Sequence, residues 1–347
     1  MKKLLFIVII SLTCNALFAQ NLFPFVKNKL WGYIDTTGKE VIAPKYQFAG
    51  FFAEGMAFAS LPGGKMGYID KTGNFVIPAK YDNASNFNEG FASVVEDEDW
   101  GVINTKGEMV IEPKYPNYIM FHDGMAKIKL ERGLFSTYGF INTKGDTVIY
   151  PKFEKVSEFS NGLCMASQDG SRYGYIDTKG NWVIKPKWDI GMVMKVNKEE
   201  IFKDKDFSDG YVSVSENDKY GVMDKTGTMI IPAKFKMIGK FSNGLAPATK
   251  DSLYGFINTK GEWVIKPKYI AAEQFSNGLA AVSTGSLFDQ KWGFINAAGK
   301  VVIPMTLGGG LSYTDPFLFL EGVTACYISE GVWGYVNRTG KVLWKSK

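Results

Sequence analysis

Apolar and polar residues alternate along most of this chain in short segments that turn residues interrupt. The segment 31–35 is typical, because period-two alternation places Trp31 and Tyr33 on one face of an extended strand. Gly32 and Ile34 then fall on the other face. No segment repeats apolar residues at helical spacing over three turns, and Gly or Pro interrupts the chain every few residues. The pattern therefore predicts an all-β protein built from short strands.

An aromatic residue followed by glycine recurs along the chain, once in each of a series of similar units. The eight aromatic copies begin at Trp31, Trp100, Tyr138, Tyr173, Tyr220, Tyr254, Trp292 and Trp333. In a ninth copy, Met66 replaces the aromatic residue. Each copy precedes a short apolar stretch and a turn of the form Asp or Asn, two residues, Gly. Nine copies in one order predict a tandem array of a single β unit.

The rest of the unit repeats as regularly. A β-branched pair (264–265) precedes Pro, Lys and an aromatic residue (267–269), and the unit closes with Phe, two mostly polar residues and Gly (275–278). The motif Gly and the closing Gly are 23 residues apart in six units, as from Gly32 to Gly55. The next leg, from the closing Gly to the following motif Gly, varies from 11 to 15 residues. A part of constant length therefore alternates with a hairpin tip that tolerates insertion.

The local chemistry predicts how the strands pair. Asp35 at the first turn position and Gly38 at the fourth match a type I turn whose Gly takes a positive φ. The pair 41–42 is expected to return as the partner strand, and Pro44 is expected to end the pairing because it has no N–H to donate. The segment 90–94 is expected to run into the next motif. Each unit is therefore predicted to be a three-stranded antiparallel meander.

The repeated rings are expected to form the core. One meander cannot bury both of its faces, so stability must come from the stacking of neighbouring units. We place the motif aromatics in this core. On this interpretation, replacing Trp100 or Tyr254 with Ala should cost about 3 kcal/mol or more.

These four motifs resemble the WG-repeat family of bacterial secreted and envelope β-repeat proteins, and the resemblance covers essentially the whole chain after residue 19. It implies a β-rich interaction module and little about activity. The predicted fold is all-β, a tandem array of about nine three-stranded antiparallel meanders. Its units form either a propeller-like ring or an open, twisted β-repeat stack. Nine units exceed the usual blade number and no split unit joins the ends, so closure is not established by the sequence.

The first residues differ in character from the repeats. Lys2 and Lys3 precede an apolar run (4–12) that is too short to span a bilayer stably, and small residues follow at 16–19. This predicts a signal peptide over 1–19 and an exported protein, in the periplasm, on the outer surface or outside the cell, with no stable membrane span after cleavage. A lipoprotein signal at Cys14 and an uncleaved anchor are the alternatives. Residues 20–347 then form a single β-repeat domain of nine units with an insertion at 189–206.

The charge distribution narrows the classes of partner, and the cysteine positions bear on disulfide formation. The formal net charge is +5, and the basic and acidic residues are interspersed along the chain. A nucleic-acid-binding protein should instead carry a stripe of one sign, so we exclude nucleic acid as a partner. Cys164 and Cys326 occupy strand positions where sister units carry small apolar residues. We expect both to be core residues without a disulfide.

No pattern in the sequence indicates catalysis. The single histidine, His122, stands where sister units carry Asn, Ser or Ala, which favours a turn residue over a base or ligand. The Asp-x-x-Gly turns lack the dense acidic ladder of a calcium loop. The run 308–310 is expected to be a flexible loop, since no strand–loop–helix context for phosphate surrounds it. We therefore predict no catalytic, cofactor-binding or metal-binding residues, although sequence alone leaves a carboxylate pair of the glycosidase kind open.

Two units break the repeat. One carries thirteen extra residues within 189–206, and another loses its Pro-Lys-aromatic signature over 305–315. Such insertions often form the contact surface of a repeat array, and neutral drift explains them equally well. Export and repetition favour a non-enzymatic protein-binding or scaffolding protein of the cell envelope or outside the cell. The alternative is a glycan- or cell-wall-binding module, which requires rows of exposed aromatic rings, and an enzyme of unrecognised type is the third hypothesis.

Overall fold

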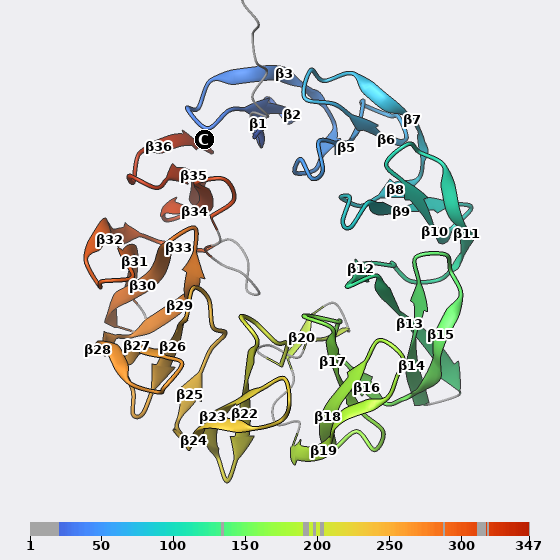
Figure 1. The fold of residues 1–347 in the computed structure, drawn as a ribbon. Coiled ribbons are helices and arrows are strands. Elements are labelled where there is room, and N and C mark those ends of the chain that lie inside the picture. The colour runs from blue at the N-terminus through green and yellow to red at the C-terminus, as the bar shows by residue number, and fades with distance from the viewer. Residues whose placement is uncertain are drawn as a thin grey trace, which may run out of the picture.

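A computed structural model describes residues 21–346, except 133–134, 190–193, 197–198, 202–204, 287–288, 311–316 and 318. Within these residues every regular element is a β-strand. Nine small antiparallel sheets stand side by side in a ring, as the blades of a β-propeller (Figure 1). The fold is therefore all-β, and of the two predicted arrangements the ring is the one that forms.

Seven of the nine blades have four strands, ordered from the centre outward as they occur in the chain. Blade 2 comprises β4 (Phe48–Ala49), β5 (Ala57–Ser60), β6 (Met66–Ile69) and β7 (Phe75–Tyr81); blade 3, β8 (Asn83–Ala84), β9 (Phe91–Glu96), β10 (Asp99–Asn104) and β11 (Met109–Tyr115); blade 4, β12 (Phe121–His122), β13 (Met125–Arg132), β14 (Phe135–Asn142) and β15 (Thr147–Phe153); blade 5, β16 (Lys155–Val156), β17 (Leu163–Ser167), β18 (Arg172–Asp177) and β19 (Trp182–Asp189). Blade 7 comprises β25 (Met237–Ile238), β26 (Leu245–Thr249), β27 (Tyr254–Asn258) and β28 (Trp263–Tyr269); blade 8, β29 (Ala271–Ser276), β30 (Leu279–Ser286), β31 (Asp289–Asn296) and β32 (Val301–Leu307); blade 9, β33 (Gly309–Gly310), β34 (Val323–Ser329), β35 (Val332–Asn337) and β36 (Val342–Lys345).

Blades 1 and 6 have three strands. Blade 1 comprises β1 (Phe23–Lys27), β2 (Leu30–Ile34) and β3 (Glu40–Tyr46), and blade 6 comprises β22 (Tyr211–Glu216), β23 (Lys219–Asp224) and β24 (Met229–Phe235). Between blades 5 and 6, the predicted insertion contains a separate two-stranded hairpin of β20 (Met194–Val196) and β21 (Glu199–Ile201).

The predicted three-stranded meander is correct for strands two to four of a blade and misses the innermost one. In blade 3, β9, β10 and β11 are the predicted strands, and β8 adds two pairs, Asn83 with Val95 and Ala84 with Val94. A two-residue strand carries no readable alternation. The run 308–310 is a second correction, because Gly309 and Gly310 form the innermost strand β33 of blade 9 rather than a flexible loop.

The motif glycine and the downstream proline belong to one feature, a bulge in the outer strand. Trp31 pairs with Tyr46 and Tyr33 pairs with Ile42, so residues 43–45 of β3 lie opposite the single residue Gly32. Pro44 stands inside this bulge, and the ladder resumes beyond it, which corrects the prediction that proline ends the strand. A Cβ on Gly32 would lie 2.5 Å from the carbonyl oxygen of Ile42. Only glycine therefore lets the bulged strand cross at this distance.

The turn that follows has the predicted geometry. The N–H of Gly38 donates to the Asp35 carbonyl at 3.0 Å, and Gly38 has φ +88°. The Asp35 carboxylate accepts the N–H groups of Thr37 at 2.8 Å and Lys39 at 3.0 Å. In five other blades Asn replaces Asp, and its side-chain oxygen accepts the same pair of N–H groups.

These turns predict a definite acid response. Burial raises the pKa of Asp35, Asp70 and Asp177, but hydrogen bonds to their carboxylates outweigh burial and leave each pKa below its ordinary value of 3.8. For Asp224 the Thr226 hydroxyl is the largest cause of a lowered pKa. A lowered folded-state pKa contributes stability above the ordinary value, and this stability is lost as the pH falls through the folded-state pKa.

We therefore expect the free energy of unfolding to fall between pH 5 and pH 2.5 more steeply in the wild type than in a variant with Asn at all four positions. The five natural Asn turns show that the amide keeps the geometry. Urea unfolding at a series of pH values measures both slopes, and equal slopes would contradict the assignment.

The blades stack through rows of equivalent side chains. The residue that directly follows each motif Gly is at most 2% exposed: Tyr33, Tyr68, Val102, Phe140, Tyr175, Val222, Phe256, Phe294 and Tyr335. This residue is aromatic in seven blades, and in six of them it packs against the Phe of the closing motif in the next blade; in blade 9 Tyr335 packs on Phe23 instead. Examples are Tyr68 with Phe87 at 4.7 Å and Phe140 with Phe159 at 4.8 Å between ring centroids. The core thus runs continuously between neighbouring blades, as predicted.

The motif aromatics themselves are not at the centre of this core. Trp100 and Tyr254 are half-buried, as are the other motif aromatics apart from Tyr173, which is buried. The prediction placed the centre of the core two residues too early. The motif ring lies where the ladder resumes beyond the bulge, beside the hairpin tip, so part of it stays in contact with water.

The Pro-Lys-aromatic motif has a structural role as well. In seven blades the lysine amine lies over the ring of the aromatic residue that follows it, at 4.9–5.8 Å from the centroid. Cation–π contacts of this kind stabilise the outer edge of a blade. In blade 8, which lacks the motif, Leu307 pairs with Trp292 and takes the place of the aromatic ring in the core.

The ring closes between blades 1 and 9 without a shared strand. Phe23 packs on Tyr335 at 5.4 Å and Phe25 packs on Trp344 at 6.1 Å between centroids. The Tyr335 hydroxyl donates to the Pro24 carbonyl at 2.9 Å. Figure 1 shows β36 beside blade 1 accordingly. Ring packing and this hydrogen bond therefore join the ends without a shared strand, which is why no split unit was visible in the sequence.

Candidate functional site at the inner wall of the ring

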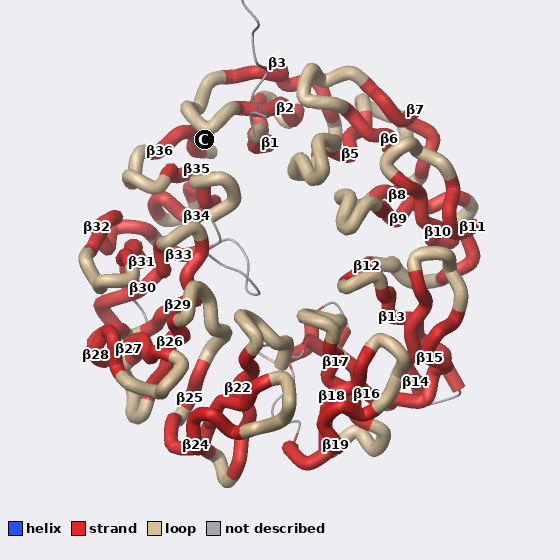
Figure 2. Tube along the Cα trace, in the orientation of Figure 1, coloured by secondary structure: helices blue, strands red, loops and turns tan. Residues whose placement is uncertain are grey.

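The closing motif of each unit forms a tight turn that points toward the centre of the ring. Figure 2 shows such loops extending inward from blades 2 to 4. In the first of them, Ala53 bridges to Met56, and both turn residues have positive φ, Glu54 at 52° and Gly55 at 86°. We call these loops the inner turns. Equivalent bridges close the inner turns of several later blades.

Polar residues of the inner turns connect one blade to the next. The Glu89 carboxylate accepts the Gly124 N–H at 2.8 Å, and the Asp123 carboxylate accepts the Gly162 N–H at 2.6 Å. The Ser208 hydroxyl donates to the Phe241 carbonyl at 2.7 Å. The polar positions of the closing motif therefore have a structural function. In blade 4 one of these positions is His122, which is half-buried.

One position at the inner wall differs from blade to blade. It is the residue directly before the Phe of the closing motif, between the short innermost strand and the inner turn, and we call it the inner-wall position. Its described occupants are Phe51, Asn86, Met120, Glu158, Asp206, Lys240 and Gln274. The Phe that follows this position recurs because it packs in the core, whereas the residue that precedes it also changes from blade to blade. The inner-wall position is free of that constraint, so its chemistry changes around the ring.

Blades 4 to 7 give this wall a charged arc. The Lys127 amine lies 2.8 Å from one oxygen of Glu158, and the Lys240 amine lies 3.5 Å from one oxygen of Asp206. The other oxygens, Glu158 Oε2 and Asp206 Oδ1, are screened from water and accept no hydrogen bond from any described residue. Carboxylate oxygens in that state are costly unless a donor reaches them.

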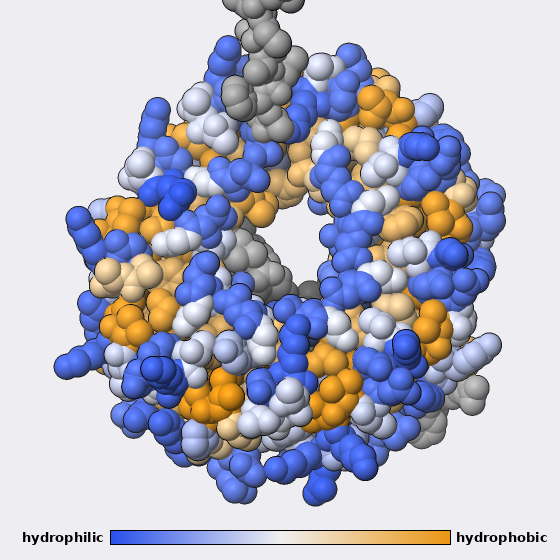
Figure 3. Space-filling view, in the orientation of Figure 1, coloured by the Kyte–Doolittle hydropathy of each residue, from blue (hydrophilic) through white to orange (hydrophobic). Residues whose placement is uncertain are grey.

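Blades 2 and 4 contribute exposed apolar side chains to the wall, which we call the apolar arc; Asn86 of blade 3, between them, is polar. Phe48 is 51% exposed and Phe51 39%, both from the inner segment of blade 2. Tyr118 and Met120, from the inner segment of blade 4, are 39% and 37% exposed. Figure 3 shows that the centre of the ring is open and that hydrophobic patches around this face are separated by hydrophilic residues. Exposed apolar side chains of the wall therefore come from blades 2 and 4, and its ion pairs come from blades 4 to 7.

The predicted insertion returns to the ring through a buried lysine. Lys205 is 8% exposed, and its amine lies 3.2 Å from the Tyr173 hydroxyl and over the Tyr173 and Tyr220 rings. Its carbonyl accepts the Tyr175 hydroxyl at 2.9 Å. The end of the insertion is thus part of the packing between blades 5 and 6. Residues 190–193, 197–198 and 202–204 of the insertion, and 311–315 of the second irregular segment, lie outside the described residues.

Cys164 and Cys326, the two cysteines among the described residues, are buried and form no disulfide, as predicted. Burial raises the pKa of Cys326 to about 12 and raises the pKa of Cys164 well above its ordinary value, so neither thiol is a ready nucleophile. Among the described residues no three His, Cys, Asp or Glu side chains are grouped closely enough to hold a metal ion. The described chain also contains no helix with the length and apolarity needed to cross a bilayer.

The architecture defines a class, the β-propellers, here with nine blades. The chain belongs to the family of the WG containing repeat. Its family model matches residues 31–65, 66–98, 100–132, 138–171, 173–190, 220–254, 254–288 and 292–307, which together make up more than half of the chain. The copy at Trp333 lies outside these matches.

Solved structures resemble the chain in fold. A crystal structure of a eukaryotic initiation factor has a TM-score of 0.58 at 12% identity, covering 94% of this chain and 96% of that one. The designed Ika8 protein has a TM-score of 0.43 at 12% identity, with 93% and 98% covered. BamB from Moraxella catarrhalis has 0.37 at 16% identity, with 93% and 95% covered. At these identities the likeness concerns the fold alone. No curated protein matches the sequence.

Proposed function

We propose that this protein is an exported, non-enzymatic scaffold that binds another protein at the inner wall of its ring. The observation that carries the proposal is the inner-wall position, which varies in chemistry directly before a Phe that repeats in every complete unit. Large exposed apolar side chains at Phe51 and Met120 are typical of contact surfaces. Export rests on the predicted signal peptide over 1–19, which lies outside the described residues.

The ion pairs of the charged arc support a partner with polar side chains opposite them. Glu158 with Lys127 and Asp206 with Lys240 are partly exposed and offer a partner both donors and acceptors. The apolar arc would receive the partner's hydrophobic side chains, so the matching surface carries apolar side chains opposite blades 2 and 4 and polar ones opposite blades 5 to 7.

Site-specific photo-crosslinking tests this proposal. A photoreactive phenylalanine at Met120 is compared with the same residue at Tyr150, which is 75% exposed on the outer strand of the same blade. Mixed with envelope extract, the Met120 probe is expected to give one discrete protein adduct that the Tyr150 probe does not give. The adduct should weaken at least tenfold when Glu158 and Asp206 are both changed to their amides. No adduct at Met120, or the same adduct at both positions, would contradict the proposal.

A deletion tests whether the insertion or the inner wall is the contact site. Removing residues 190–202 takes out thirteen residues and restores the 23-residue spacing of the regular units, while Lys205 and Asp206 stay in place. If the inner wall is the contact surface, this deletion should leave the Met120 adduct unchanged. Loss of the adduct would move the contact site to the insertion.

A further inference from the structure

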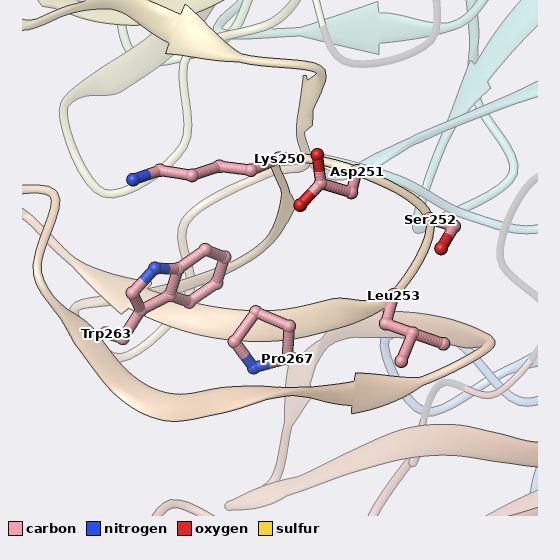
Figure 4. Close-up of a pocket in the computed structure, with 6 residues that line it drawn as sticks. All are labelled: Lys250, Asp251, Ser252, Leu253, Trp263 and Pro267. Atoms are coloured by element: carbon pink, nitrogen blue, oxygen red, sulfur yellow. The ribbon is translucent and has the colours of Figure 1, made fainter.

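Blade 7 carries a groove at its outer edge that the proposed function does not use. The groove has a volume of about 360 Å³ and is lined by Lys250, Asp251, Ser252, Leu253, Trp263 and Pro267. The first four belong to the loop between β26 and β27, and the last two stand on the outer strand β28. Figure 4 shows the Lys250 side chain extended across from the Trp263 indole, with Asp251 on the loop beside it.

Trp263 is held in place by the neighbouring blade. Its indole packs edge-on against Phe235 of blade 6, with 5.7 Å between ring centroids, and it is half-buried. The Lys250 amine lies over the same Phe235 ring at 5.5 Å. An aromatic ring that is fixed on one edge and lines a groove offers a preformed stacking surface.

Two of the polar side chains that line the groove are free to bind a ligand. Asp251 and Ser252 are exposed, and neither side chain hydrogen-bonds to another described residue. Blade 5 has a loop of the same length at the same place, and there the carboxylate of Asp169 accepts the N–H groups of Ser171 and Arg172 at 2.9 and 3.0 Å. The blade 5 carboxylate is consumed by its own loop, whereas that of blade 7 is available to a ligand.

We propose that this groove binds a neutral saccharide. An indole and a proline ring offer a flat apolar surface for the C–H face of a sugar, while a carboxylate, a hydroxyl and an amine can pair with its hydroxyl groups. One positive and one negative side chain leave the groove balanced, which disfavours an anionic or cationic ligand. The volume is at the small end of ligand sites. A single local groove, and not a row of motif rings, carries this chemistry.

Saturation-transfer NMR with cellobiose and with N,N′-diacetylchitobiose as the probes tests the proposal. The wild type is expected to transfer saturation to the ring C–H protons of at least one probe, with a dissociation constant near the millimolar range. Trp263→Ala should weaken binding at least tenfold. Asp251→Asn should weaken it several-fold, and this exposed position leaves the fold intact.

Trp182 is the matched control. It occupies the same place in blade 5 and packs on Phe153 with the same 5.7 Å between centroids. Trp182→Ala therefore removes an equivalent contact between blades and should leave saccharide binding unchanged. Absence of binding of both probes to the wild type would overturn the proposal. Equal weakening by Trp182→Ala and Trp263→Ala, or no effect of Asp251→Asn, would overturn it as well.

Discussion

Replacing Gly139 with Ala is expected to destabilise the protein by about 3 kcal/mol or more, one of the largest effects of any single methyl group in this chain. A Cβ at this motif glycine would lie 2.2 Å from the Ile149 carbonyl oxygen and 2.6 Å from the Pro151 nitrogen. Both atoms belong to the backbone of the bulged outer strand. Neither can move without breaking the ladder on each side of the bulge, so the strain cannot be relieved by a change of side-chain rotamer.

Gly55 supplies the matched control for this prediction. It has φ +86°, and an added Cβ would meet nothing within 4 Å. Gly55→Ala should therefore cost only the strain of a left-handed alanine, about 1 kcal/mol. Chemical unfolding of both variants measures the difference. Equal costs would show that the motif glycine is needed for its conformation and not for the close crossing.

The second large predicted effect is the loss of stability when Phe256 is replaced, compared with Tyr254 of the same motif. Phe256 directly follows the motif glycine of blade 7, is fully buried and packs on Phe275 of blade 8 at 5.0 Å. Phe256→Ala should cost about 3–5 kcal/mol, because it leaves a cavity between two blades. Tyr254, two residues earlier, is half-buried, so Tyr254→Ala should cost about 1–2 kcal/mol.

Thermal or urea unfolding of the two single variants tests this order. The measurement also decides between the sequence-based core, which included Tyr254, and the core that the structure places two residues later, at Phe256. A cost at Tyr254 equal to or above that at Phe256 would restore the original assignment.

The sequence predicts the repeat well because packing between blades constrains the same positions in every copy. The turn at 35–38, the pairing of the three longer strands and the burial of Cys164 all followed from local patterns. The bulge did not, because proline in a strand usually ends a ladder, and only the register of Trp31 and Tyr33 against β3 reveals that the ladder resumes. The two-residue innermost strands are too short for any periodicity.

Ring closure and the inner-wall position could not be predicted from the sequence for a different reason. Packing of Phe25 on Trp344 joins residues more than three hundred positions apart, and no local pattern marks such a pair. The inner-wall position was passed over because it does not repeat, although its variability within a regular array is the signal that identifies it. The groove at Trp263 depends on how one loop lies relative to the outer strand of its blade, and no local sequence pattern specifies this.

Pulsed electron resonance between two spin labels tests most directly whether the ring is closed. One label at Lys27 of blade 1 is paired with a label at Glu330 of blade 9, and a reference pair joins Lys27 to Lys65 of blade 2; all three sites are exposed. Cys164 and Cys326 are buried and should not react. A closed ring predicts that the Lys27–Glu330 distance is single, narrow and similar to the reference distance between neighbouring blades. A Lys27–Glu330 distance that is broad or much longer than the reference would show an open array and contradict the account.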